Sequence, residues 1–139
     1  MVVKGSYCLC IEVCDSIKIR IGSLGFIDFL KGYYVYVGSA LTGLEKRIER
    51  HIKISKGEHS VTHWHIDYLL RDKNAKIKSV FIKKSDVKIE CEISEKMSGF
   101  GIPVRNFGSS DCKCGSHLYN IEGCEVIQKL DLKQFSINQ

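Results

Sequence analysis

The residues of this sequence best suited to chemistry lie in its first half. Tyr7 falls in an alternating run typical of a strand, and Tyr36 falls in a second β-rich run. Arg47 and His51 stand four positions apart where the pattern becomes helical, so both lie on one side of that helix. A guanidinium presents a fixed fork of donors to phosphate oxygens, and tyrosine or histidine can orient or move a proton. These residue types suit chemistry on a phosphate group.

Two predicted strands carry the tyrosines. Residues 6–13 alternate, with Tyr7 and Leu9 on one face and Cys8 and Cys10 on the other. Residues 33–37 form the second strand, which stops at Gly38. A third alternating run over 17–21 lies in the connection, which is longer than a simple hairpin requires. The sequence therefore leaves the pairing of the two tyrosine strands open.

The helix that presents Arg47 and His51 is predicted to run from Thr42 to about Ser55. Thr42 and Glu45 have the spacing of a capping box. Apolar residues at helical spacing form the stripe that we expect to be buried: Leu44, Ile48 and Ile52. Arg47 and His51 lie at the edge of this stripe, where we expect them to lean toward the sheet without leaving water.

The rest of the chain predicts further strands and helices. These are a helix over 63–71 begun by Thr62, a strand over 76–83, a helix over 87–97 begun by Asp86 or Ser85, and short strands over 117–121 and 125–130. Such a mixture of a sheet with segregated helices predicts an α+β fold, with a central, mainly antiparallel sheet flanked by helices. A length of 139 residues suits one domain over 1–139.

The order of these motifs resembles the GIY-YIG nuclease superfamily. Gly5-Ser6-Tyr7 begins one strand, Tyr36-Val37-Gly38 ends another, and Arg47 and His51 follow. In that superfamily a strand with Gly-Ile-Tyr pairs with a strand ending in Tyr-Ile-Gly, and a later helix presents an arginine. Serine and valine replace the two isoleucines here, and the change at Ser6 is mild if that position faces solvent.

Three later stretches are similar to an uncharacterised branch of that superfamily: 63–69, 90–92 and 107–118. Relatives in this branch occur alone or attached to endonuclease III-type DNA glycosylases. The resemblance implies metal-dependent hydrolysis of phosphodiester bonds in nucleic acid, with DNA favoured over RNA. It also implies a DNA repair protein as a possible partner.

The resemblance assigns roles to individual residues. One Mg²⁺ or Mn²⁺ ion would be held by a glutamate on a later helix, which is Glu90 or, as the alternative, Glu92. Arg47 would bind phosphate, and Tyr36 would bind phosphate or support Tyr7. Tyr7 would act as the base or orient water, and a base role requires a lowered pKa or a relayed proton.

His51 would contact phosphate or hold Tyr7. Further contacts to nucleic acid are expected from Gly38, Ser39, Lys46 and Arg50.

Net charge, the absence of targeting segments and the cysteine content limit the partners, the cellular location and the thiol state that we expect. Lys and Arg outnumber Asp and Glu by 21 to 16, a net charge of +5, which suits a polyanionic partner. The sequence shows neither a signal peptide nor a membrane-spanning run, so we expect a cytoplasmic protein without a membrane partner. The 7 cysteines are an odd number, and without a secretion signal we expect mostly reduced thiols.

Two other clusters of potential metal ligands give weaker predictions of a metal site. Zinc is disfavoured at Cys112, Cys114 and His117, because Cys-x-Cys is tight for one ion and a fourth ligand would be remote. A second metal site at His63, His65 and Asp67 is disfavoured because only the first and last share a helical face.

Trp64 and Tyr68 are expected in the core rather than as base-stacking platforms. The rival functions are a catalytically silent DNA- or RNA-binding module and a metal-built scaffold for protein contacts.

Overall fold

The computed structural model describes residues 3–59, 62, 64–108 and 115–135. Its main sheet consists of β1 (Gly5–Val13), β4 (Gly32–Ala40), β5 (Ala75–Lys84), β6 (Ile102–Pro103), β7 (Leu118–Ile121) and β8 (Lys133–Phe135). These six strands lie in the order β6-β7-β4-β1-β5-β8, and every neighbouring pair is antiparallel. β1 is therefore a central strand.

The pairing of β1 with β4 answers the question that the sequence left open. Tyr7 lies opposite Gly38, and Leu9 lies opposite Tyr36. Because opposite residues of an antiparallel pair share a face, and positions two apart on one strand do too, both tyrosines lie on the same face of the sheet.

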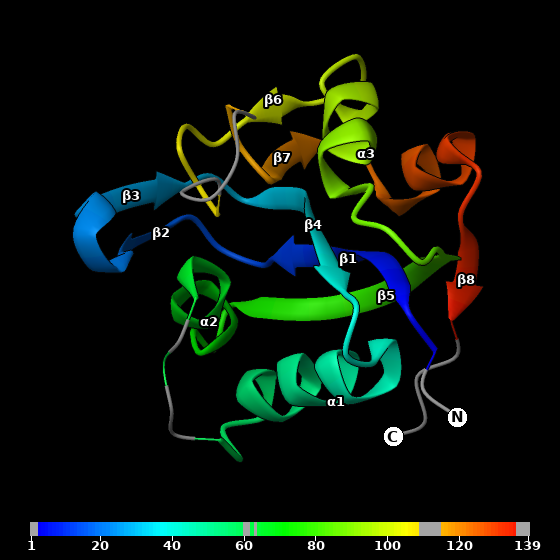
Figure 1. The fold of residues 1–139 in the computed structure, drawn as a ribbon. Helices are drawn as coiled ribbons and strands as arrows, with labels where there is room; N and C mark the ends of the chain where they lie inside the picture. Colours follow the sequence, from blue (N-terminus) through cyan, green and yellow to red (C-terminus); the bar gives the residue numbers. More distant parts are fainter. Residues whose placement is uncertain (1–2, 60–61, 63, 109–114, 136–139) are drawn as a thin grey trace.

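The long connection between these strands holds a second, small sheet. It consists of β2 (Ile17–Arg20) and β3 (Phe26–Phe29), joined through the 3₁₀ turn η1 (Gly22–Leu24). The predicted strand over 17–21 is thus present but ends one residue earlier, and β3 was not predicted. Figure 1 shows this pair of strands projecting at one side of the main sheet.

Helices cover both faces of the main sheet (Figure 1). The helices α1 (Leu44–Ser55) and α2 (His65–Leu70) lie on one face, and α3 (Glu90–Met97) and the 3₁₀ segment η2 (Cys124–Leu130) lie on the other. The expected α+β architecture is confirmed. Within the described ranges, no helix has the length and apolar character needed to cross a membrane.

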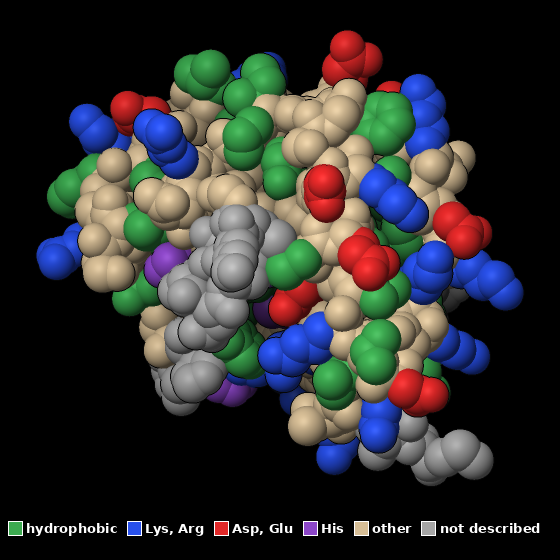
Figure 2. Space-filling model, turned by 45° about the horizontal axis from the view of Figure 1, so that its top comes forward, with side chains coloured by type: hydrophobic (Ala, Val, Ile, Leu, Met, Phe, Trp, Pro, Cys, Tyr) green, Lys and Arg blue, Asp and Glu red, His purple; other side chains and the backbone are tan. Residues whose placement is uncertain are grey.

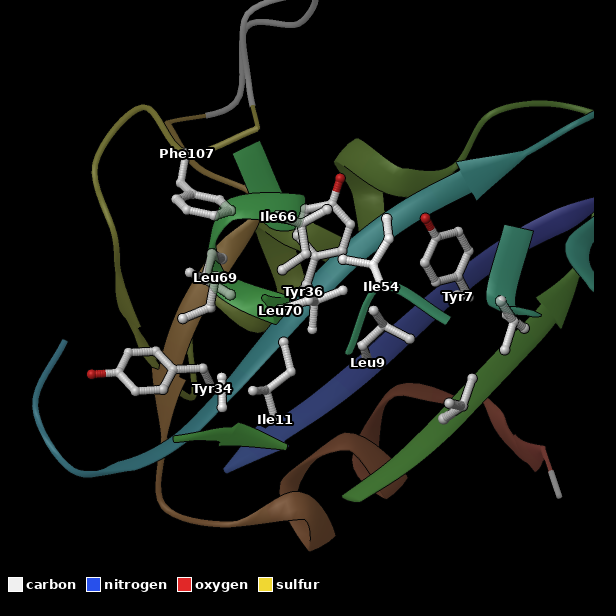
Figure 3. Close-up of a cluster of buried hydrophobic side chains, with 14 of the residues drawn as sticks. Tyr7, Leu9, Ile11, Tyr34, Tyr36, Ile54, Ile66, Leu69, Leu70 and Phe107 are labelled. Atoms are coloured by element: carbon white, nitrogen blue, oxygen red, sulfur yellow. The ribbon is translucent and has the colours of Figure 1, made fainter. Parts of the chain in front are cut away.

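This arrangement gives β1 two buried faces. Tyr7 and Leu9 belong to the core under α1 and α2, part of which Figure 3 shows. Cys8 and Cys10 belong to the core under α3 and η2. All four side chains are at most 1% exposed, so both faces of β1 are shielded from solvent. A strand buried on both faces explains why polar alternation in β1 is weak.

The start of α1 corrects the predicted capping box. The helix begins at Leu44 with Gly43 as its N-cap, and no side chain among the described residues caps it. Gly43 has φ 145°, a conformation that favours glycine, and the Leu44 N–H bonds to the carbonyl of Val3 at 2.8 Å. Backbone geometry therefore does what Thr42 was expected to do, and Thr42 stays exposed in the turn.

Two other predicted elements differ from the structure. The helix over 87–97 begins at Glu90, because Ser85 forms a local turn with the backbone of Val87 instead of capping the helix. Residues 125–130 lie in the 3₁₀ segment η2 and not in a strand.

The cap of α2 is Trp64, whose backbone N–H donates to the carboxylate of Asp67 at 3.0 Å. The predicted cap was Thr62, and the predicted first residue, 63, lies outside the described residues.

A disulfide between two described residues is an exception to the expectation of mostly reduced thiols. Cys10 and Cys124 are bonded, with their Cα atoms 5.7 Å apart, and they tie β1 to the start of η2. Cys8 and Cys14 are free thiols, as expected. Counting cysteines misses such a pair because only the fold brings together positions separated by 114 residues.

Candidate functional site

A pocket of about 530 Å³ gathers the principal residues predicted from the sequence. Tyr7 from β1, Tyr36 from β4, Arg47 from α1 and Glu90 from α3 all line it. Gly38 and Ser39 at the end of β4 line it as well. The pocket thus joins elements from both faces of the sheet, at the end of β4 where the chain turns into α1.

The two tyrosines lie beside each other in this pocket. Their ring centroids are 6.4 Å apart, and Figure 3 shows both hydroxyls directed to the same side, while the hydroxyl of Tyr34 points elsewhere. Gly38 makes room for this arrangement, since a Cβ at that position would lie 2.5 Å from the ring of Tyr7. Gly38 is therefore needed for the position of Tyr7. The prediction that it ends the strand is wrong, because β4 continues through Ser39 to Ala40, which pair with β1.

The hydroxyl of Tyr7 forms a hydrogen bond of 2.6 Å with Nε2 of His51. His51 is 0% exposed, so the expectation that it stays at the wet edge of the helix is wrong. The reason is that its ring packs between Tyr7 and Trp64, with centroids 5.4 and 6.2 Å away. The resemblance left two roles open for His51, a contact to phosphate or the holding of Tyr7. The hydrogen bond to the Tyr7 hydroxyl fits the second role.

Burial keeps this pair neutral. Desolvation lowers the pKa of His51 to about 3, although the carboxylate of Asp67 acts in the opposite direction. Desolvation also raises the pKa of Tyr7 well above its usual value, and the charge of Arg47 opposes this only in part. The residues of the protein alone therefore do not lower the pKa of Tyr7, which leaves a relayed proton as the route to a base.

Tyr36 is held neutral in the same way. Burial is the main cause that raises its pKa, and the negative charge of Glu90 adds to it. Both pocket phenols thus keep their protons, and the hydroxyl of Tyr36 can donate a hydrogen bond to an anionic ligand, whereas the hydroxyl of Tyr7 is shared with His51.

Arg47 is fixed from two sides. Its Nη1 donates to the carbonyl of Ser39 at 3.1 Å, and its guanidinium carbon lies 4.5 Å from the ring centroid of Trp64. Ser39 is itself held, since its hydroxyl bonds to that of Ser6 at 3.0 Å. Ser6 is 0% exposed, so the condition under which serine would be a mild replacement, a position facing solvent, is not met. Trp64 is half-buried: it packs against the core, as expected, and also lines the pocket.

The other two predicted basic contacts lie elsewhere. Arg50 forms a two-pronged ion pair with Asp67, with N–O distances of 3.1 and 3.0 Å. Lys46 is exposed on α1, outside the pocket. The pocket thus receives one of the three cations that were expected to meet nucleic acid on this helix.

The two candidate metal-binding glutamates separate clearly. Glu90 is half-buried and lines the pocket, whereas Glu92 is exposed on α3. Within the described residues, no group of three or more His, Cys, Asp or Glu side chains is placed to hold a metal ion. Mg²⁺ commonly takes one or two carboxylates, with waters and substrate phosphates as its other ligands. Glu90 in a pocket that also presents Arg47 fits that mode of binding.

Two side chains of the second metal site considered from the sequence, His65 and Asp67, make other contacts in the structure. Nδ1 of His65 accepts the backbone N–H of Gly108 at 2.9 Å, and Asp67 pairs with Arg50. His63, Cys112 and Cys114 lie outside the described residues.

Sequence reasoning missed several residues that line the pocket: Trp64, His65, Lys88, Gly108 and His117. His117 is 4% exposed, and burial lowers its pKa while Glu90 opposes the shift. Lys88 carried no usable signal, because nothing local tells a lysine that faces a pocket from one on the surface. For Trp64 the sequence did contain a signal, because Trp64 and Asp67 have the same spacing as Arg47 and Arg50.

Comparison with known proteins gives one match. A family model described as a domain of unknown function, DUF123, covers residues 6–136. The chain belongs to the DUF123 family. Curated proteins and solved structures provide no match to the DUF123 chain.

The DUF123 region includes every pocket residue discussed above. Its pocket offers a fixed cation for an anionic group, two protonated phenols, and a carboxylate for a hard cation. Behind one phenol lies a neutral imidazole that can hold or receive a proton. This set of groups can bind a phosphate and polarise a water beside it.

Proposed function

We propose that this DUF123 chain is a Mg²⁺- or Mn²⁺-dependent endonuclease of the GIY-YIG type that hydrolyses phosphodiester bonds, with DNA favoured over RNA. The observation that carries the proposal is the convergence of Tyr7, Tyr36, Arg47 and Glu90 on one pocket. These residues come from four elements, and the pairing of β1 with β4 was not assured by the sequence. Their meeting is what a phosphodiester-cleaving centre requires.

Arg47 binds the scissile phosphate in this proposal. Its contacts to Ser39 and Trp64 hold it in place before a ligand arrives, and its remaining N–H groups can face two phosphate oxygens. Tyr36 donates a hydrogen bond from its hydroxyl to a phosphate oxygen. Glu90 would hold the metal ion, which supplies positive charge for the leaving oxygen when bound.

Tyr7 orients the attacking water and passes its proton on. The proposed relay takes the imidazole tautomer with its proton on Nδ1, so that the Tyr7 hydroxyl donates to Nε2 of His51 and a lone pair of the phenolic oxygen is left to accept a proton from water. As the water oxygen bonds to phosphorus, the water proton moves to Tyr7 and the phenolic proton moves to His51. The bond from phosphorus to the leaving oxygen then breaks.

The low pKa of His51 has two effects on this relay. It keeps the imidazole neutral at neutral pH, so that one ring nitrogen can accept a proton, but it also makes the imidazole a weak acceptor. The negative charge of a bound phosphate raises the proton affinity of both the Tyr7 phenol and the His51 imidazole. The relay therefore operates only when substrate is in place.

The wider surroundings are part of the same proposal. We place the protein in the cytoplasm, with DNA as its partner and a DNA repair protein as a further one. The +5 net charge favours a polyanion. Figure 2 shows basic and acidic side chains interspersed on the face that contains α3, so binding there relies on individual contacts more than on one basic patch.

A substrate panel tests the proposal. Labelled single-stranded, duplex, flap and junction DNA, with matching RNA, are incubated with Mg²⁺, Mn²⁺ or chelator. We expect cleavage of at least one DNA substrate that chelator stops and Arg47→Ala removes. Lys53→Ala, which removes an exposed cation from the same helix, should cleave as the wild type does.

The rival functions give different results in that panel. Salt-dependent binding without cleavage in any metal would indicate the silent binding module. Loss of the fold in chelator, with zinc bound to the purified protein, would indicate the metal-built scaffold.

A further inference from the structure

Two pairs of residues with the same spacing face each other across α1 and the start of α2. Arg47 and Arg50 are three positions apart on α1, and Trp64 and Asp67 are three positions apart at α2. Both guanidinium carbons lie 4.5 Å from the ring centroid of Trp64. One tryptophan therefore contacts the arginine that lines the pocket and the arginine that does not.

Asp67 holds Arg50 and the backbone of Trp64 in this arrangement. Its side chain is 0% exposed, and its two oxygens accept from Nη1 and Nη2 of Arg50 at 3.1 and 3.0 Å. The second oxygen also accepts the backbone N–H of Trp64 at 3.0 Å. A carboxylate buried in this way sets the place of Arg50 and of the tryptophan backbone together, because leaving it unpaired would be strongly unfavourable.

We propose that Trp64, held by the Arg50–Asp67 ion pair, is a positioning residue that keeps the guanidinium of Arg47 ready for a phosphate of a nucleic-acid strand. The choice of ligand rests on the proposed function. The holding of Arg47 does not, because it is a property of the protein alone. An arginine side chain has many rotamers, and ordering it before binding removes an entropic penalty from the binding step. The contact with Ser39 uses one donor of Arg47 and leaves others for the ligand.

A measurement on the free protein tests the holding of Arg47. Side-chain NMR relaxation of the arginine Nε–H groups compares the wild type with Trp64→Leu, Asp67→Asn and Tyr68→Leu. Tyr68 is half-buried on the same helix but lies against Gly22, so it serves as the matched aromatic control.

We expect the Nε–H order parameter of Arg47 to fall in Trp64→Leu and Asp67→Asn, and to stay at the wild-type value in Tyr68→Leu. An equally mobile Arg47 in the wild type and Trp64→Leu would overturn the proposal. Should Trp64→Leu fail to fold, Trp64→Phe keeps an aromatic face and should leave Arg47 more ordered than Asp67→Asn does.

A binding measurement tests the consequence for the ligand. Fluorescence anisotropy follows a labelled 12-nucleotide single-stranded DNA in chelator, which prevents cleavage. Removing the cation–π contact should weaken binding by about 2- to 30-fold in Trp64→Leu, with a smaller loss in Trp64→Phe. In the Arg47→Ala background, Trp64→Leu should cause no further loss, because a positioning residue acts through the group that it positions.

The outcomes separate this inference from the nuclease proposal. Wild-type protein that binds with this coupling but never cleaves would contradict the nuclease and support the positioning role. Equal affinity of the wild type and Trp64→Leu, additive losses in the double variant, or absence of binding would overturn the role proposed for Trp64 toward phosphate.

Discussion

The burial of His51 predicts that the free energy of unfolding falls when the pH is lowered from 7 to 5. In the folded protein the pKa of His51 is lowered to about 3 by desolvation, while an unfolded chain offers histidine its ordinary value near 6.5. Between these values the unfolded state binds one more proton than the folded state. Stability is therefore complete above the unfolded pKa and decreases as the pH falls toward the folded one.

The size of the effect follows from the two pKa values. Proton linkage with 6.5 and about 3 gives a loss of about 2 kcal/mol between pH 7 and pH 5. The result is almost the same for any folded pKa below about 4, because His51 in the folded protein is then neutral throughout this range. The prediction thus depends on the burial of the imidazole and not on the exact pKa.

Urea unfolding followed by circular dichroism at pH 7, 6 and 5 provides the measurement. Burial also lowers the pKa values of His65 and His117, and both add a loss of the same sign. His51→Gln isolates the contribution of His51: its loss between pH 7 and 5 should be smaller than the wild-type loss by about 2 kcal/mol. Tyr7→Phe removes the hydrogen bond to the imidazole but leaves it buried, so its pH dependence should stay near that of the wild type.

Equal losses in the wild type and His51→Gln would refute this reasoning. They would mean that the imidazole is protonated in the folded protein at pH 5, and that the relay described for Tyr7 lacks its acceptor. A loss reduced by the same amount in Tyr7→Phe and His51→Gln would instead assign the shift to the hydrogen bond and not to burial.

Three further predictions follow from the pocket and the core. Gly38→Ala should destabilise the protein by about 1–3 kcal/mol and reduce cleavage, because the new Cβ would lie 2.5 Å from the ring of Tyr7; unfolding and cleavage assays check this, and wild-type behaviour in both would contradict it. Tyr7→Phe should slow cleavage by about 10²–10⁴-fold while DNA affinity stays within about threefold, and a normal rate would exclude the relay. Cys10→Ser should lower the free energy of unfolding by about 2–5 kcal/mol under oxidising conditions, because it opens a link across 114 positions, and a reductant should bring the wild type to the same value.

The strands of the main sheet were largely predictable because their cause is local. Alternation in residues 6–13 and 76–83 locates β1 and β5 to within one residue at each end. The pairing of β1 with β4 was not predictable, since the intervening segment folds into a sheet of its own. The start of α1 was missed for a related reason: the carbonyl that receives its first N–H belongs to Val3, from a distant part of the chain.

The candidate site shows the same division between local and long-range causes. Residue types and order pointed to Tyr7 and Arg47, the family resemblance pointed to Glu90 with Glu92 as the alternative, and Tyr7, Arg47 and Glu90 do line one pocket. The complete burial of His51 could not be predicted, because it depends on Trp64 packing over the helix from outside. The pairing of Arg50 with Asp67 was likewise hidden, since a basic residue next to a phosphate-binding arginine looks like another phosphate contact in sequence.

The most direct measurement of the central claim compares two glutamine substitutions on one helix. Glu90 lines the pocket and Glu92 is exposed nearby, so Glu90→Gln and Glu92→Gln change the same chemical group in and out of the site. Single-turnover cleavage of the best DNA substrate is measured across a Mn²⁺ titration. We predict that Glu92→Gln cleaves like the wild type, whereas Glu90→Gln loses cleavage at every Mn²⁺ concentration yet still binds DNA. Equal cleavage by the two variants would contradict the assignment of this pocket as the catalytic centre.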